Sequence, residues 1–189
     1  LYNIDEDPHE TNNLANDKNY NETLIDLRNE LNNHLVSIND LSFLPEPHLL
    51  KNGLNDIVSY SEKNKDLIKR LIEISDLSLY DYDEVSSSLK DALNDDNPWV
   101  RYWGVIVNST FGNKALENKE KINFIFENDS ENLVRMRAAE FMLLNNIEIS
   151  DSKINSLLVR SNFEAEANLM LNTLANLKTK DSDYKLKLG

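Results

Sequence analysis

The sequence contains no cysteine, only four glycines and four prolines, and 20 basic residues against 33 acidic ones. Without cysteine the chain can form neither disulfides nor thiolate metal sites, and it has no cysteine nucleophile. The scarcity of glycine and proline disfavours a fold of many short strands, because such folds need frequent chain reversals. A formal net charge of −13 argues against DNA, RNA and anionic membranes as partners, since these bind through clustered lysine and arginine.

Long apolar runs are absent as well. No stretch approaches the roughly 18 consecutive apolar residues of a membrane-spanning helix, so we expect no membrane span. Apolar residues nevertheless make up 40% of the 189 residues. By size scaling, a chain of this length can bury about 70% of its unfolded surface, which is enough for a real core.

The first 42 residues combine two features. Residues 1–4 alternate in polarity and run into acidic residues and Pro8, which predicts a short strand that ends in a turn. Apolar residues then recur at spacings of three and four, which predicts a helix over 21–37 with one apolar stripe. The stripe comprises Leu24, Leu27, Leu31 and Leu35. One strand and one amphipathic helix cannot enclose a core, so we expect the stripe to dock on another surface.

Pro45 and Pro47 interrupt the regular pattern, because proline disfavours helix at the preceding residue and has no backbone N–H to donate. We therefore place a boundary after residue 42 and predict connecting helices over 43–80. Apolar spacing in the second half of this range predicts a helix that ends near Ser78.

A repeat begins after residue 80. Asp95 and Arg101 recur as Asp129 and Arg135, each 34 positions later, and in both copies the acid precedes the arginine by six residues. Two helices per unit at this period predict an all-α superhelix of antiparallel helix pairs over 81–178.

Each copy carries the signals of a helix start and a helix end. Asn97 and Ser130 are candidate N-caps, and Pro98 stands where the first helical residue needs no N–H. Gly112-Asn113 and Asn145-Asn146 suit left-handed C-terminal caps. The helices expected ahead of the two copies span about 83–94 and 115–128.

A third, degraded copy runs from about Ser150 to Leu177, with Asn162 and Asn168 at the spacing of the acid and the arginine. A terminal repeat has no following neighbour, so the loss of the charged pair fits a capping role. Residues 179–189 are highly charged, and we expect them to form a flexible tail.

The positions of Asp95, Arg101, Asp129 and Arg135 resemble those of the aspartate and arginine in HEAT repeats. In that family the two side chains form a ladder of hydrogen bonds between neighbouring repeats. The resemblance implies an architectural role for these four residues.

The opening block Leu1–Ala15, with its Asp-Pro-His-Glu and Asn-Asn-Leu-Ala sequences, resembles the C-terminal part of bacterial sulfatases of the alkaline-phosphatase-like superfamily. The later blocks Leu41–Glu46, Leu67–Glu73 and Asn97–Gly104 resemble the HEAT-bearing tail of a subset of these enzymes. The resemblance implies that 1–42 closes the smaller subdomain of a sulfatase, in a parent enzyme that is secreted or periplasmic.

That family hydrolyses sulfate esters or sulfamates, often on carbohydrates, with a calcium ion and a formylglycine made from the first residue of a Cys/Ser-x-Pro-x-Arg motif. Here no proline is followed two residues later by arginine. We therefore expect no catalytic, cofactor or metal site in this chain, and the parent enzyme would hold the calcium and the formylglycine.

Some residues also invite functional interpretations. Trp99, Tyr102 and Trp103 could stack on sugar rings, but their segment is apolar nearly all round, which favours burial. Lys69-Arg70, and Arg135 with Arg137, could meet sulfate groups, although neighbouring acids favour solvated pairs or the repeat ladder. The three histidines lack the i, i+4 spacing of a metal site. They are His9, His34 and His48.

We interpret the chain as the non-catalytic C-terminal region of a sulfatase, acting in packing, assembly or shaping of the substrate entrance. Its expected partner is its own upstream catalytic domain, and a second copy of the chain is a further candidate. The alternative is a free-standing HEAT-like scaffold that binds another protein in its concave groove, which solenoid geometry supports equally well.

Overall fold

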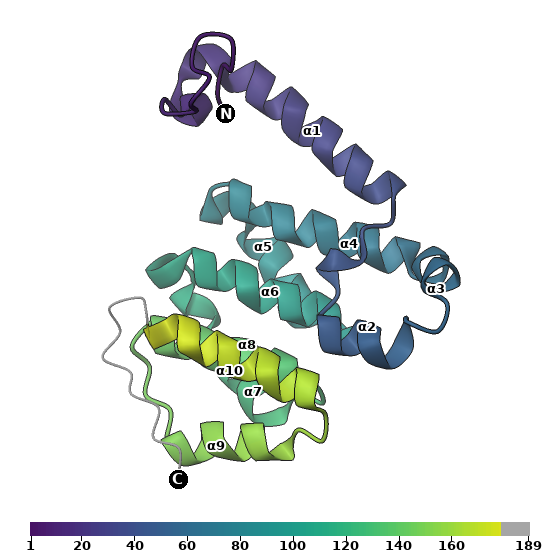
Figure 1. Ribbon diagram of the computed structural model, residues 1–189. Coiled ribbons are helices and arrows are strands. Elements are labelled where there is room, and N and C mark those ends of the chain that lie inside the picture. The colour runs from purple at the N-terminus through teal and green to yellow at the C-terminus, as the bar shows by residue number, and fades with distance from the viewer. Residues whose placement is uncertain (179–189) are drawn as a thin grey trace. The chain divides into compact units, whose positions relative to one another are not determined.

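A computed structural model describes residues 1–178 of the chain (Figure 1). The chain divides into two compact units, Leu1–Asp40 and Leu41–Gly189. Every regular element among the described residues is a helix. The expected tail, 179–189, lies outside the described residues.

The helix predicted in the first unit is confirmed. α1 spans Asn21–Ser37, and two short 3-10 helices, Leu14–Asn16 and Lys18–Tyr20, precede it. Asn13 caps the first of these with its side-chain oxygen, 3.0 Å from the amide nitrogen of Ala15.

The short strand predicted over residues 1–4 is wrong. This segment turns back on itself: the amide nitrogen of Asp7 lies 2.7 Å from the carbonyl oxygen of Asn3, and that of Leu14 lies 2.7 Å from the carbonyl oxygen of Leu1. A strand needs a second strand for its backbone groups, and none lies in the described part of the chain. Local turns satisfy those groups instead.

The second unit is an array of helices that pack in two layers. α4, α6, α8 and α10 pack one on the next and form an inner layer, while α5, α7 and α9 each pack against a neighbouring inner helix (Figure 1). This arrangement confirms the predicted all-α superhelix. The α-helices of this unit are α2 (Glu46–Asn52), α3 (Ile57–Lys63), α4 (Lys65–Asp76), α5 (Tyr82–Leu93), α6 (Pro98–Thr110), α7 (Lys119–Asn128), α8 (Asn132–Leu144), α9 (Asp151–Arg160) and α10 (Glu164–Lys178).

A segment at the start of the second unit crosses the inner layer. Leu41–Gly53, here called the strap, contains a 3-10 turn, Leu41–Phe43, and the short helix α2, Glu46–Asn52. The turn packs on α4, and α2 packs on α10. Leu44, Pro45 and Pro47 are buried. The two prolines that interrupt the sequence pattern therefore become part of the core.

The ends of α6 and α8 follow the sequence signals except at the start of α8. Asn97 caps α6, with its side-chain oxygen 2.9 Å from the amide nitrogen of Trp99, and Pro98 is the first helical residue. Gly112 and Asn146 adopt the left-handed conformation shortly after α6 and α8. Ser130 does not cap α8, because Glu131 holds that position and the helix begins one residue later.

A buried polar network joins α5 to α6. The Nδ2 atom of Asn118 lies 2.8 Å from Oδ1 of Asn108 and 3.1 Å from the hydroxyl oxygen of Tyr82, which donates to Glu117 over 2.7 Å. Asn118 ends a 3-10 helix, Gly112–Asn118, where the sequence predicted the start of one longer α-helix. These bonds satisfy the Asn118 amide, which would otherwise be buried without partners.

Candidate functional site

Successive inner helices enclose three grooves, which we number along the chain: the first lies between α4 and α6, the second between α6 and α8, and the third between α8 and α10. The second groove contains a well-formed charged contact. Arg101 of α6 donates from Nε to Oδ2 of Asp129 over 2.6 Å and from Nη2 to Oδ1 over 2.9 Å. The side chains are 15% and 2% exposed, so this bidentate pair is nearly dry. Asp129 belongs to the loop before α8. The pair therefore joins one helix pair to the next, as the ladder prediction requires.

The first groove repeats this contact in a more exposed form. Arg70 of α4 pairs with Asp95, and the arginine side chain is 51% exposed. Asp95 does not bond to the side chain of Arg101; instead Nη1 of Arg101 donates to the carbonyl oxygen of Asp95 over 2.7 Å. Arg70 is thus a ladder residue, which is one of the three interpretations that the sequence allowed for it.

The third groove departs from the pattern. Nε of Arg135 donates to the carbonyl oxygen of Phe126 over 2.7 Å, and no hydrogen bond joins Arg135 to a carboxylate within residues 1–178. The predicted counterparts Asn162 and Asn168 are exposed. Ser161 takes the position of the acid instead. Its Oγ accepts from the backbone N–H of Phe163, two residues on, as Oδ1 of Asp129 accepts from the backbone N–H of Glu131.

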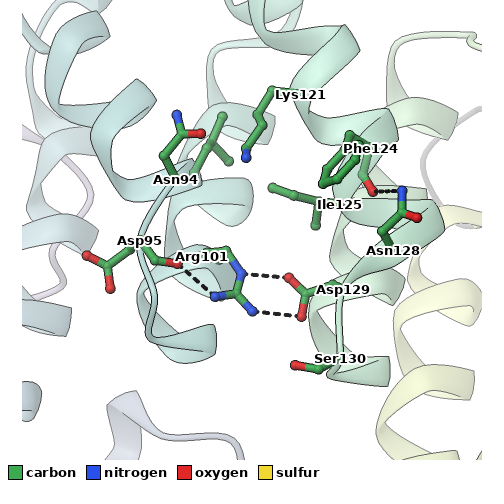
Figure 2. Close-up of a pocket in the computed structure, with 10 residues that line it drawn as sticks. Asn94, Asp95, Arg101, Lys121, Phe124, Ile125, Asn128, Asp129 and Ser130 are labelled. Atoms are coloured by element: carbon green, nitrogen blue, oxygen red, sulfur yellow. Dashed lines mark hydrogen bonds and ion pairs between the residues drawn. The ribbon is translucent and has the colours of Figure 1, made fainter.

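An open hollow of about 360 Å³ lies beside the Arg101–Asp129 pair (Figure 2). Arg101 and Asp129 form one wall, and Lys121 and Phe124 of α7 form another. The Lys121 ammonium lies 5.4 Å from the centre of the Phe124 ring. Asp129 and the carbonyls of Asp95 and Asp96 occupy the Arg101 donors, so this guanidinium has little capacity left for a ligand. The Arg101–Asp129 pair at this hollow therefore serves to join two helix pairs.

The strap packs on the aromatic residues of α6. The indole N–H of Trp103 donates to the carbonyl oxygen of Phe43 over 2.7 Å, and the two rings lie 5.5 Å apart. Trp99 and Tyr102 are buried. The packing interpretation of these aromatic residues therefore fits, and the strap is what covers Trp103 in part.

His48 of the strap contacts both α3 and α6. Its ring lies edge-on to Trp99 with centroids 4.6 Å apart, and Nε2 lies 2.7 Å from the hydroxyl oxygen of Tyr60 in α3. Asn52 donates from Nδ2 to the His48 carbonyl over 2.9 Å and approaches Nδ1 at 3.2 Å, so Nδ1 is the acceptor and Nε2 carries the proton. Burial, and then the Lys51 charge, lower the pKa of His48.

The docking stripe on α1 has no cover within its own unit. No residue of α1 is buried, and Leu27 and Leu31 are 47% and 56% exposed. Leu24 and Leu35 are half-buried. The sequence placed all four residues on one face of the helix, and the helix observed over 21–37 keeps them there.

No group of three or more His, Asp or Glu side chains within residues 1–178 could hold a metal ion. His9 and His34 are exposed. No described helix is both long enough and apolar enough to cross a membrane.

No family model, no curated protein and no solved structure matched the chain.

Proposed function

We propose that this chain is a non-catalytic accessory region of a larger hydrolase of the sulfatase type. Residues 1–40 dock on the catalytic domain through the α1 stripe, and the helical array packs beside that domain, where it stabilises the enzyme or shapes its substrate entrance. The sulfatase assignment rests on the resemblance of Leu1–Ala15 and of the later blocks. In the parent enzyme, calcium and formylglycine would supply the chemistry.

The observation that carries the docking part is the contrast in burial between the two units. α1 buries no residue and presents Leu27 and Leu31 to solvent. Covering such leucines stabilises by roughly 1.5–3 kcal/mol per side chain. An exposed apolar stripe on a surface helix is typical of a surface that meets a partner.

The alternative, a scaffold that binds a partner protein in its inner groove, has less support. The strap already covers part of the inner layer, through Phe43 and His48 on α6 and through α2 on α10. A partner at that face would have to displace buried Leu44 and Pro47.

Two experiments test the proposal. The coding sequence upstream of Leu1 should encode a Cys/Ser-x-Pro-x-Arg motif; an upstream sequence without it would remove the sulfatase assignment. In the full-length protein, Leu27→Ser with Leu31→Ser should lower the thermal midpoint of the catalytic domain by several degrees. Asn29→Ser with Asn33→Ser, on the opposite face of α1, is the matched control and should leave it unchanged. Equal midpoints for both double variants would exclude docking through the stripe.

A further inference from the structure

The strap is held to the array as a bound peptide would be. Leu44 and Pro47 are buried, and the indole N–H of Trp103 donates to the carbonyl oxygen of Phe43 over 2.7 Å. At the other end of the strap, α2 packs on α10. None of these contacts requires the strap and the array to belong to the same copy of the chain.

A short connection joins the strap to the rest of the array. Residues 54–56, here called the hinge, follow the strap, lead into α3 and are exposed. No hydrogen bond joins Leu54 or Asn55 to another described residue. The connections ahead of α6 and α8 are different, because Asp95 and Asp129 each accept a backbone N–H of their own loop and pair with an arginine of the preceding inner helix. The hinge lacks the restraints that fix those two connections.

Apolar side chains are exposed on both sides of the hinge. Leu54 and Val58 are 60% and 70% exposed, and Leu50 and Ile57 are exposed as well. These four residues, here called the hinge patch, fall between the end of α2 and the first turn of α3, so they lie close together. A group of exposed apolar side chains of this kind marks a surface that meets another one.

Charge does not oppose contact between two copies at this patch. The whole chain carries a formal net charge of −13, so most of its surface repels a second copy. Between residues 50 and 63, however, the charged residues are two lysines and two acids, which balance. They are Lys51, Asp56, Glu62 and Lys63. The hinge patch therefore lies in a segment without net charge.

We propose that the strap docks on the array of a second copy, so that two chains exchange straps and form a two-fold symmetric dimer. Each hinge then extends instead of folding back, and the two hinge patches cover one another near the two-fold axis. Exchange keeps every contact between strap and array, so the two states differ only in the hinge and in the new contact between patches. This inference does not depend on the proposed function.

Refolding the complete 189-residue chain from urea at several concentrations tests the exchange. A short linker gives closure within one chain an effective concentration on the order of millimolar, so exchange should appear only as the chain concentration approaches that range. There, light scattering should detect a species of twice the monomer mass, and refolding after dilution should give the monomer. A wild-type chain that is monomeric at every concentration would overturn the proposal.

Two changes of hinge length distinguish exchange from simple contact between patches. Deletion of residues 54–56 leaves only Gly53 between α2 and α3, fewer than the roughly two to five residues that connect packed helices. This variant should therefore be a dimer even when it is refolded after dilution. Insertion of Gly-Ser-Gly-Ser after Asn55 keeps every contacting side chain and eases closure, so it should reduce the dimer about tenfold or more. An insertion variant that dimerises as strongly as wild type would exclude exchange.

Substitutions in the hinge patch test the new contact without touching the strap. Leu54→Ser with Val58→Ser should weaken the dimer about tenfold or more, because these side chains lose the apolar surface that the second copy covers. Leu79→Ser with Val159→Ser, at exposed positions outside the hinge patch, is the matched control and should leave the dimer unchanged. Equal dissociation constants for both double variants would contradict the role of the hinge patch.

Discussion

The two units of this chain bury their apolar residues to different degrees. The array packs Phe126, Phe141 and Ile68 completely, whereas no residue of 1–40 is buried. Amphipathic helices gain most of their stability from tertiary packing, and α1 has little of it within its own unit. The contrast indicates that the array encloses a core of its own, whereas residues 1–40 enclose none.

The largest expected effect is a core truncation in the array. Phe141→Ala should lower the free energy of unfolding by about 3–5 kcal/mol, because a fully buried aromatic ring leaves a cavity. Leu31→Ala in α1 should change the unfolding of the array by less than about 0.5 kcal/mol. Urea titration followed by circular dichroism checks both. A similar loss for both variants would break the distinction between the units.

The two Arg–Asp pairs of the ladder should contribute different amounts to the free energy of unfolding. Arg101→Ala leaves Asp129 buried without its cation and should cost about 3 kcal/mol. Arg70→Ala removes a half-exposed partner and should cost about 1 kcal/mol or less. The same urea titration compares the two variants. If Arg70→Ala cost as much as Arg101→Ala, the burial of a pair would not determine how much that pair contributes to stability.

The strap should respond to pH through His48. Because its pKa in the folded strap lies below its ordinary value of 6.5, the released strap binds the proton more readily. The stability that this group contributes is present above pH 6.5 and declines as the pH falls below it. The indole N–H signal of Trp103 should therefore shift at acid pH in wild type, and much less in His48→Gln. An identical acid response in both would place the titrating group elsewhere.

Removal of residues 1–40 should have the smallest effect. The thermal midpoint of the remaining array should stay within about 2 °C of the full chain, because none of the deleted residues is buried. Differential scanning calorimetry of the two chains measures this. A drop of more than about 5 °C would mean that the first unit contributes to the stability of the array.

Much of the architecture could be predicted from local signals. Periodicity of apolar residues fixed the helix over 21–37, and Asn97 with Pro98 marked the start of α6 because capping depends on a few adjacent residues. The strand over 1–4 could not be judged in this way. Strand formation depends on a partner strand that lies elsewhere in a chain, and alternation alone does not supply one.

The details of the ladder and the strap lay beyond the sequence pattern for a related reason. Asn162 and Ser161 are neighbours, and only the backbone bond to Phe163 shows which of them takes the position of the acid. His48 lies in a proline-flanked segment with no periodicity, and its contacts with Tyr60 and Trp99 come from two other helices. Such contacts depend on tertiary packing.

The strap also changes how this array must fold. In a simple repeat array each unit touches only its neighbours, so folding can begin anywhere and spread. Phe43 and Trp103 are 60 residues apart in the sequence, and α2 packs on α10 at the far end of the array. Contacts between distant residues slow folding, because a long loop must close before they form. The strap leaves the ribosome before the array but finds its complete binding surface only after α10, which makes its docking the closing step.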